Sequence, residues 1–386
     1  MRTDDDHSPI SAQNAKRLFA DWKAAPAIVL AVSGGPDSIA LMWLAARWRR
    51  ALARGPRLIA VTVDHGLRAE AAAEARDVKR LARILDLPHR TMRWTDAKPG
   101  TGLPAAARTA RYRLLALAAR ASGATHILTA HTRDDQAETL LMRMLRGSGI
   151  SGLAAMARQS ERDGVLLARP FLQVSKSQLV ATLKKAKIGY ADDPTNRDTN
   201  FTRPRLRAIM PVLAAEGGDT RNLARLASRL ARANAAVEVL VDGAERYLAL
   251  KDDEASRSGL GAKAFGSKAF GSKTFDAKTF DAKAFDAKAF DAKAFDAKAF
   301  AAMPEEIRLR LLKRAIDRFG HEGPAELGKV EALLAALDRA VAENSRGRRP
   351  SLSRSRLKQT LGGALVSLID GRICVEPAPP RRGRAD

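Results

Sequence analysis

The chain has 386 residues, of which 46% are hydrophobic, so it is long enough for two or three domains with buried cores. Lys and Arg number 67 against 43 Asp and Glu; this net charge of +24 favours a polyanionic partner such as nucleic acid, although an Arg-rich codon bias also explains it. The single cysteine, Cys374, excludes a disulfide framework and an iron–sulfur cluster, and without a membrane span or a secretory signal the protein is expected in the cytoplasm.

Strands that alternate with helices are predicted over residues 25–190. Because a helix connects each strand to the next, the strands should pair in parallel, with helices on both faces of the sheet. We therefore expect an α/β fold, with a Rossmann-like parallel sheet in a first domain over residues 1–215 and a helical linker over 216–260. Apolar runs predict strands at 27–32, 57–63, 89–94 and 126–129, and helical patterns predict helices at 14–23, 38–53, 69–85, 104–122, 134–146 and 221–250.

A five-residue repeat fills residues 261–300. Five residues turn a helix by about 500°, so successive Phe side chains point about 140° apart, and on a strand they alternate between faces. Since neither structure buries them together, we interpret the block as a tolerated insertion, disordered or weakly helical. A segment that contacts RNA through its Phe and Lys side chains is the alternative. Phe recurs at 265, 270, 275, 280, 285, 290, 295 and 300, and Lys at 263, 268, 273, 278, 283, 288, 293 and 298.

A C-terminal domain is expected over residues 301–386. Helical patterns at 304–319 and 325–344 precede a short β-like segment at 359–375, so this small domain is predicted to be α+β. Residues 344–386 hold ten Lys or Arg against three Asp or Glu. This basic tail favours contact with nucleic acid, and a solvated chain end is the alternative. The oligomeric state is left open by the sequence.

A glycine-containing loop joins the first predicted strand to its helix. Glycines let the backbone approach an anion closely, and the N–H groups and dipole of a helix start favour a phosphate; a simple tight turn is the alternative. Two serine hydroxyls add donors. Asp37 does not suit an anion site unless it meets a cation, so we expect Mg²⁺ there and an exposed position for Asp37. The loop consists of Ser33, Gly34, Gly35, Pro36, Asp37 and Ser38.

This loop resembles that of the PP-loop ATP pyrophosphatase superfamily, and further motifs resemble the tRNA(Ile)-lysidine synthetase family. The resemblance is dense over residues 25–210 and thin beyond 220. It implies that ATP, with Mg²⁺, adenylates the C2 oxygen of the wobble cytidine in a tRNA(Ile) with a CAU anticodon. The amine of free L-lysine then displaces AMP, which forms lysidine and switches decoding to AUA. The motifs are VDHGLR at 63–68, ARTARY at 107–112, LTAHTRDDQAET at 128–139, RGSGI at 146–150, GL at 152–153, DPTN at 193–196 and TLGG at 360–363.

The expected catalytic residues lie on one helix face and in the loop. His131 and Asp135 stand four residues apart at a helix start, with Glu138 one turn further on, so they share a face. Such a face can hold Mg²⁺ through Asp135 together with Asp37, position the lysine ammonium and accept a proton. The catalytic residues predicted are therefore Asp37, His131, Asp135 and Glu138. The alternative, ordinary enrichment of acids at a helix start, explains Asp134 better than it explains His131 with Asp135.

Binding residues are expected at strand ends and on arginine-rich helices. Asp64 and His65 end the second predicted strand, where an adenine or ribose edge commonly lies, and a plain turn is the alternative. Arginine guanidinium groups suit phosphates, and a solvated helix face is the alternative. For ATP binding we predict Asp64, His65 and Arg108 besides the loop, and for tRNA binding Arg111, Arg203, Arg205 and Arg207.

Two positions depart from the family pattern. The second histidine of the pattern is Thr132 here, which weakens any mechanism that needs two imidazoles. The Arg–Asn pair of the pattern is Arg203–Pro204, so an amide contact is lost. Another PP-loop tRNA-modifying or amidating enzyme, or an RNA- and nucleotide-binding protein without catalysis, therefore remains as an alternative. Thiolases of the superfamily generally need paired cysteines, and the intact loop argues against lost catalysis.

Overall fold

The computed structural model describes residues 6–67, 71–191, 198–200, 202–257, 293–345 and 357–379. Two compact units, Met1–Ala233 and Asn234–Asp386, divide within the long helix α9 (Thr220–Arg257), which occupies the predicted helical linker. Arg68, the DPTN motif at 193–196 and residues 261–292 of the repeat lie outside the described residues. No helix in the described ranges is long and apolar enough to cross a membrane.

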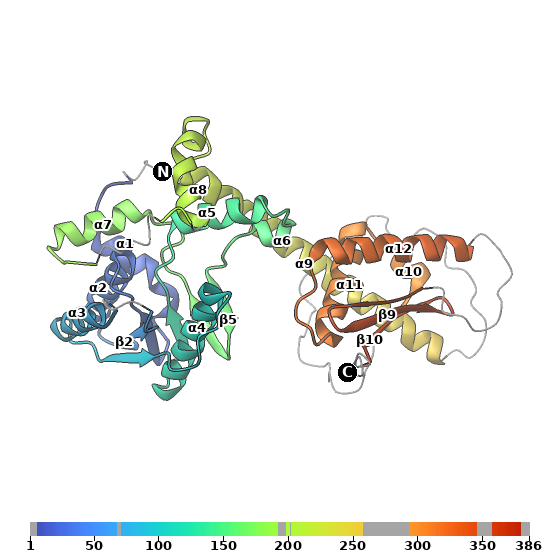
Figure 1. Cartoon of the computed structure of the whole chain (residues 1–386), viewed down its shortest axis with the longest axis horizontal. Helices are drawn as coiled ribbons and strands as arrows, with labels where there is room; N and C mark the ends of the chain where they lie inside the picture. The colour runs from blue at the N-terminus through green and yellow to red at the C-terminus, as the bar shows by residue number, and fades with distance from the viewer. Residues whose placement is uncertain are drawn as a thin grey trace. The chain divides into compact units, whose positions relative to one another are not determined.

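The first unit is built on a six-stranded sheet in the order β3-β2-β1-β4-β6-β5. Figure 1 labels β2 and β5 of this sheet and the helices that surround it. The first five strands of this order pair in parallel, which confirms the predicted parallel sheet. The last strand, β5, runs antiparallel to β6 in a hairpin that was not predicted. The strands are β1 (Ala27–Ala31), β2 (Arg57–Asp64), β3 (His89–Arg93), β4 (His126–Leu128), β5 (Gln159–Arg162) and β6 (Val165–Ala168).

Alternate residues of β1 pack into different cores on the two faces of this sheet. Ile28 and Leu30 belong to the core beneath α1, α2, α3 and α7, whereas Val29 belongs to the core beneath α4. Every residue of β1 is buried, as expected for a parallel strand covered on both sides. The helices are α1 (Ala12–Leu18), α2 (Pro36–Arg50), α3 (Ala71–Ile84), α4 (Leu103–Ala121), α5 (Arg133–Met144), α6 (Ile150–Leu153), α7 (Lys176–Lys185) and α8 (Thr202–Ala215), with a 3₁₀ helix at Ala20–Trp22.

The strand order reverses between β1 and β4. From β1 the chain proceeds outward to β2 and β3, and it returns to β4 on the other side of β1. In open α/β sheets this switch point leaves a crevice at the carboxyl ends of the two strands, where ligands bind. Here α2 follows β1 and α5 follows β4, so the phosphate loop and the segment that leads into α5 meet at this position. The expectation that His131 and Asp135 share a helix face was wrong, because α5 begins at Arg133 and His131 precedes it.

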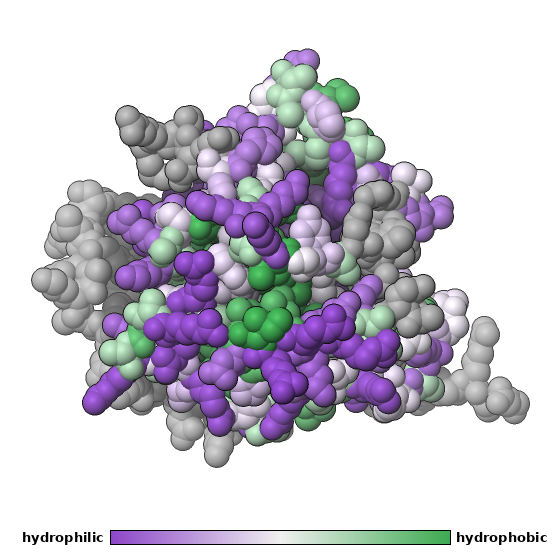
Figure 2. All heavy atoms as spheres, turned by 90° about the vertical axis from the view of Figure 1, so that its left-hand side faces the viewer, coloured by the Kyte–Doolittle hydropathy of each residue, from purple (hydrophilic) through white to green (hydrophobic). Residues whose placement is uncertain are grey.

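The second unit packs helices on a four-stranded antiparallel sheet in the order β7-β10-β9-β8. Its helices and C-terminal strands confirm the α+β prediction. On the molecular face shown in Figure 2, which is the left-hand side of Figure 1, many hydrophilic side chains surround a smaller hydrophobic patch near the centre. The elements of this unit besides α9 are β7 (Lys293–Asp296), α10 (Ala297–Ala301), α11 (Glu305–Phe319), α12 (Leu327–Ser345), β8 (Leu357–Leu361), β9 (Ala364–Ile369) and β10 (Arg372–Pro377).

The last two units of the five-residue repeat belong to this second core. Phe295 on β7 and Phe300 on α10 are each 1% exposed, and their ring centroids lie 5.7 Å apart. Between them Asp296 ends the strand and caps α10 by accepting the Ala299 N–H. The interpretation of the whole block as a removable insertion was therefore wrong for residues 293–300. The chain changes from strand to helix between the two Phe residues, and this change brings their rings together. A continuous helix or a continuous strand would keep them apart.

Replacing Phe295 with Ala is expected to destabilise the second unit by about 3–5 kcal/mol, because a fully buried aromatic side chain would leave a cavity. Urea unfolding followed by far-UV circular dichroism measures this free energy. Ile369→Ala, at a 43% exposed position in the same sheet, is the matched control and should cost less than about 1 kcal/mol. Equal stabilities of Phe295→Ala and the control would contradict the burial of Phe295.

Candidate active site

The phosphate loop presents uncapped N–H groups to open space. Gly34 has φ +90°, a conformation that side-chain-bearing residues rarely adopt. Gly35 is the N-cap of α2, without a side-chain hydrogen bond, and a Cβ built on it meets no atom within 4 Å. The first N–H groups of α2 therefore have room to receive an anion.

The two loop serines hold the loop closed. Ser38 Oγ accepts a hydrogen bond from the Ser33 N–H (3.1 Å) and donates to the Gly35 carbonyl oxygen (3.0 Å). The Ser33 and Ser38 hydroxyl oxygens lie 3.3 Å apart. The Ser38 hydroxyl is thus used within the loop. Of the two serine hydroxyls predicted to bind phosphate, that of Ser33 is the one left for this role.

Asp37 lies in the first turn of α2 and is mostly buried, with its side chain 23% exposed, so the exposed position expected for it was wrong. The first helical turn directs it toward Lys176, whose Nζ lies 3.7 Å from Asp37 Oδ2. Asp37 Oδ1 is buried and has no hydrogen-bond partner among the described residues. Burial raises the pKa of Asp37 to about 6; the Lys176 ammonium opposes this rise and the negative Asp135 adds to it.

Thr132 and Asp135 form a capping box at the start of α5. The Thr132 N–H and hydroxyl both donate to Asp135 Oδ2, at 2.8 and 2.9 Å, and the Asp135 N–H donates to Thr132 Oγ1 at 3.3 Å. The other carboxylate oxygen, Oδ1, lies 3.7 Å from Lys176 Nζ. Burial opposes ionisation of Asp135, but the Lys176 charge and the Thr132 hydrogen bond outweigh it and lower the pKa. Thr132, which replaces the second histidine of the family pattern, therefore orients the carboxylate.

His131 is held by Thr129 at the end of β4. Its Nδ1 lies 2.8 Å from Thr129 Oγ1, and this hydroxyl donates to the Ala168 carbonyl oxygen at 3.4 Å. Nδ1 then carries the hydrogen, which leaves Nε2 able to accept a proton. Burial lowers the pKa of His131 far below its ordinary value; Asp135 opposes this and the positive Arg169 reinforces it. His131 is thus neutral at pH 7.

Glu138 is engaged by arginines of α8. Its side chain is 4% exposed, and Arg207 Nε donates to Oε1 at 2.6 Å while Arg203 Nε lies 3.8 Å from Oε2. Burial opposes the charge of Arg207, but its hydrogen bond to Glu138 raises the pKa. Glu138 therefore ties α5 to α8, and its carboxylate is less free to meet a substrate than that of Asp135.

Replacing Arg207 with Met is expected to destabilise the first unit by about 3 kcal/mol, since a buried carboxylate would lose its hydrogen-bonded partner while only the longer contact to Arg203 remains. Urea unfolding measures the change. The double variant Arg207→Met, Glu138→Gln should recover most of the loss, because the unpaired charge is then removed. Additive effects of the two substitutions would contradict the pairing.

The three arginines predicted to bind tRNA from α8 do not share a surface. Arg203 and Arg207 are four residues apart and face α5. Arg205 is exposed and donates to the carbonyl oxygens of Thr199 and Asn200. Residues two apart on a helix point about 200° apart, which explains the separation.

Asp64 and His65 lie at the end of β2, on the opposite side of β1 from β4. Asp64 Oδ1 accepts the Gly66 N–H at 2.9 Å, and the side chain is 13% exposed. His65 packs edge-on against Trp94, with ring centroids 6.3 Å apart, and its buried Nδ1 has no hydrogen-bond partner in the described part of the chain. Burial lowers the pKa of His65, and the positive Arg111 adds to this effect.

Two arginines of α4, Arg108 and Arg111, lie near these strand ends. The Arg108 guanidinium lies 5.2 Å from the Tyr112 ring centroid and is otherwise exposed. Arg111 is half-buried, and its charge lowers the pKa of both His65 and His131, so it acts on the ends of β2 and β4. Within the described ranges neither Arg108 nor Arg111 forms an ion pair, which suits an anionic ligand.

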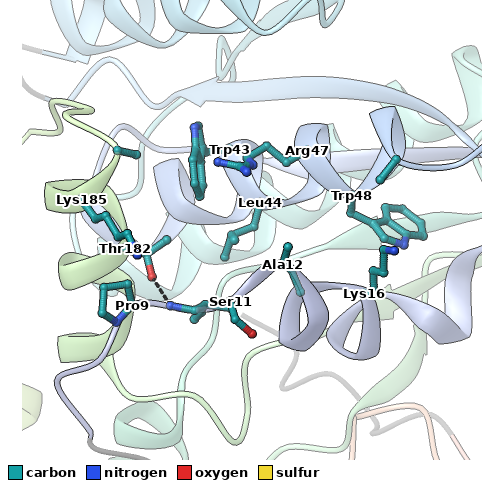
Figure 3. A pocket seen from close by; sticks show the side chains of 14 residues that line it. Pro9, Ser11, Ala12, Lys16, Trp43, Leu44, Arg47, Trp48, Thr182 and Lys185 are labelled. Atoms are coloured by element: carbon teal, nitrogen blue, oxygen red, sulfur yellow. Dashed lines mark hydrogen bonds between the residues drawn. The ribbon is translucent and has the colours of Figure 1, made fainter.

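A separate pocket of about 370 Å³ lies between α1, α2 and α7 (Figure 3). Its lining contains two tryptophans, three cations and no carboxylate, besides small and apolar residues; the tryptophans are Trp43 and Trp48, and the cations are Lys16, Arg47 and Lys185. It adjoins the C-terminal half of α2 and the end of α7, whereas the phosphate loop and Lys176 lie at the beginnings of these helices. None of the predicted site residues lines it, so the candidate active site is the strand-end crevice.

The crevice fits Mg²⁺ bound together with phosphate. Asp37 Oδ1 lacks a partner, and Asp135 Oδ1 faces the same ammonium as Asp37 Oδ2. Mg²⁺ is usually held by one or two carboxylates and by substrate phosphates. The described residues contain no group of three or more His, Cys, Asp or Glu that could hold a metal ion unaided. The donor set therefore suits an ion completed by a nucleotide.

Comparison with known proteins defines the class first. Residues 7–213, more than half of the chain, match the PP-loop domain family, so this is a PP-loop protein. A tRNA(Ile)-lysidine synthase of Bradyrhizobium diazoefficiens is 65% identical over 386 residues, covering 100% of this chain and 99% of the relative. Those of Rhodopseudomonas palustris (60% over 380 residues, 98% of each chain) and Methylobacterium nodulans (43% over 383 residues, 97% of this chain and 98% of the relative) are similar. The chain belongs to the tRNA(Ile)-lysidine synthase family.

Proposed function

We propose that this ligase uses ATP and Mg²⁺ to join free L-lysine to C2 of the wobble cytidine of a tRNA(Ile) with a CAU anticodon, in the cytoplasm. The observation that carries the proposal is the placement of Asp37 and Asp135 on either side of the Lys176 ammonium, next to the open phosphate loop. Family membership over the whole chain supports the choice of tRNA. The chemistry requires two steps at this crevice.

In the first step the cytidine C2 oxygen attacks the α-phosphorus of ATP, and the bond to the β-phosphate breaks to release pyrophosphate. The uncapped N–H groups of α2 would bind phosphate oxygens. The Lys176 ammonium and Arg108 would offset the charge of the leaving pyrophosphate. Asp37 and Asp135 would hold Mg²⁺, which supplies charge neutralisation at the phosphates.

In the second step the lysine amine attacks C2, and AMP leaves with the oxygen that belonged to C2. The amine must be unprotonated to attack, and we assign His131 Nε2 as the acceptor of its proton, with the negative Asp135 and the bound phosphates stabilising the imidazolium against the effect of burial. Asp135 would position the ammonium before that transfer. Glu138, which is paired with Arg207, would act by fixing α5.

We assign tRNA binding to exposed or unpaired cations around the crevice. Arg111 has no carboxylate partner among the described residues, and Arg205 is exposed, so both are available to phosphates of the tRNA backbone. Arg203 and Arg207 would have to loosen their contacts with Glu138 to do the same. We propose that the second unit also contacts the tRNA, because the sequence from residue 344 onward is basic.

The test is to incubate the purified protein with ATP, Mg²⁺, radiolabelled lysine and the CAU tRNA, and to count label in the tRNA. We expect incorporation that is lost when the wobble cytidine is replaced. AMP release without lysine incorporation would indicate another PP-loop reaction. Absence of both, on folded protein, would indicate a nucleotide-binding protein without catalysis.

A further inference from the structure

The polar segment before α1 contacts the beginnings of three helices through one residue, Asp6. Its carboxylate pairs with Arg133 NH2 at 2.7 Å and with Arg221 NH2 at 2.8 Å. Its carbonyl oxygen accepts hydrogen bonds from the hydroxyls of Ser175 (2.9 Å) and Ser177 (2.6 Å). Arg133 begins α5, Ser175 is the N-cap of α7, and Arg221 lies in the first turn of α9.

Two of these helix ends carry the charged groups of the candidate active site. Arg133 is two residues before Asp135 on α5, and Lys176 stands between the two serines that Asp6 binds. The Lys176 N–H also donates to Asp134 Oδ2 at 2.9 Å, which connects α7 to α5 directly. The Arg133 N–H likewise donates to the Val174 carbonyl oxygen at 2.9 Å. Asp6 adds its side-chain and carbonyl contacts to these direct bonds between the two elements whose spacing places Lys176 Nζ next to Asp135.

Loss of the Asp6–Arg133 ion pair would be energetically unfavourable. The Arg133 side chain is only 7% exposed, and Asp6 is the carboxylate that pairs with it in the described part of the chain. Leaving a buried guanidinium without its counter-charge is strongly unfavourable. Without Asp6, the beginning of α5 would move toward solvent to relieve this cost.

We propose that Asp6 is a positioning residue for the ligation reaction: through Arg133 and the two serines it fixes the distance between Asp135 and Lys176. Asp6 contacts neither substrate nor reacting atoms. The proposal rests on the proposed function and extends it to the segment before the first helix. The phosphate loop is closed by its own serine hydrogen bonds and does not depend on Asp6.

The test compares Asp6→Asn with the full-length parent in the lysine-incorporation assay, at a temperature where circular dichroism shows both fully folded. We expect kcat to fall about 10- to 100-fold, as for displacement of catalytic groups by about 1 Å. KM for ATP should change less than about threefold. Asp6→Glu, which keeps the carboxylate, should recover most of kcat. Asp21→Asn, which removes a partly exposed pair with Arg158 in the same unit, is the matched control and should leave kcat unchanged.

The possible outcomes distinguish failure of the positioning role from failure of the proposed function. An unchanged kcat in folded Asp6→Asn, or equal losses in the Asn and Glu variants, would overturn the positioning role while the proposed function stands. A parent protein that incorporates no lysine would overturn the proposed function and this role with it. Should Asp6→Asn fail to fold, Ser177→Ala removes one hydrogen bond to the Asp6 carbonyl and should still lower kcat with KM for ATP unchanged; an unchanged kcat there would also overturn the role.

Discussion

Replacing Asp37 with Asn is expected to slow the release of pyrophosphate from ATP by about 10²- to 10³-fold while the first unit remains folded. Asp37 Oδ1 is a buried carboxylate oxygen beside the open phosphate loop, without a hydrogen-bond partner among the described residues, and Asn removes the negative charge from that position with little change in shape. Loss of one such electrostatic contact lowers kcat by about 10²- to 10³-fold. Pyrophosphate release in the presence of the CAU tRNA measures the effect, and near-normal turnover would contradict the metal-holding role of Asp37.

The same substitution also tests how burial of Asp37 affects the stability of the protein. Burial raises the pKa of Asp37 to about 6 from 3.8, so the charged form is disfavoured in the folded protein. The native state therefore binds a proton at Asp37 more tightly than the unfolded state does. As the pH rises and this proton is lost, the free energy of unfolding falls, and the fall is complete above pH about 6. Asp37→Asn should therefore raise the free energy of unfolding by up to about 3 kcal/mol at pH 8, and the difference should vanish below pH about 4. A variant less stable than the parent at pH 8 would contradict this.

Replacing Lys176 with Met is expected to lower kcat by about 10²-fold, because its ammonium is the positive charge shared by Asp37 and Asp135. The pH profile should change as well. Activity that needs ionised Asp37 falls as the pH drops through its pKa, and without Lys176 nothing on α7 opposes the effect of burial. The acidic limb of the kcat/KM profile, which reports the free enzyme, should therefore move from about pH 6 to higher pH.

Lys185→Met provides the matched control for Lys176. Both lysines lie on α7, but Lys185 is exposed at its C-terminal end, remote from the phosphate loop. We expect the control to keep the parent kcat and pH profile. An acidic limb that stays near pH 6 in Lys176→Met would show that Lys176 does not control the ionisation of Asp37.

Much of the first unit could be predicted because its strands are apolar runs followed by amphipathic helices. The β5–β6 hairpin was missed since each strand has only four residues, although Asp163 and Gly164 between them both have positive φ, as a two-residue hairpin turn requires. The buried pair of Phe295 and Phe300 was missed because a period-based argument assumes one uniform structure across a repeat. Both failures concern short elements whose form is decided by tertiary packing.

Lys176 is the candidate site residue that the sequence analysis did not identify. Its neighbours Ser175 and Gln178 form a capping box, a pattern that marks a helix start in sequence. A lysine in the first turn of a helix is unfavourable with the helix dipole, so it signals an anionic partner nearby. Which anion it meets depends on how α7 packs beside α2 and α5. That tertiary arrangement, unlike the loop motif, has no local signature.

The central claim is that the cytidine C2 oxygen becomes part of AMP, and isotope transfer tests it most directly. A CAU tRNA whose wobble cytidine carries ¹⁸O at C2 would be incubated with the protein, ATP, Mg²⁺ and lysine, and the AMP analysed by mass spectrometry. We predict that AMP carries one ¹⁸O for each lysine joined to the tRNA. Unlabelled AMP, with ¹⁸O retained in the tRNA or found in water, would contradict adenylation of that oxygen.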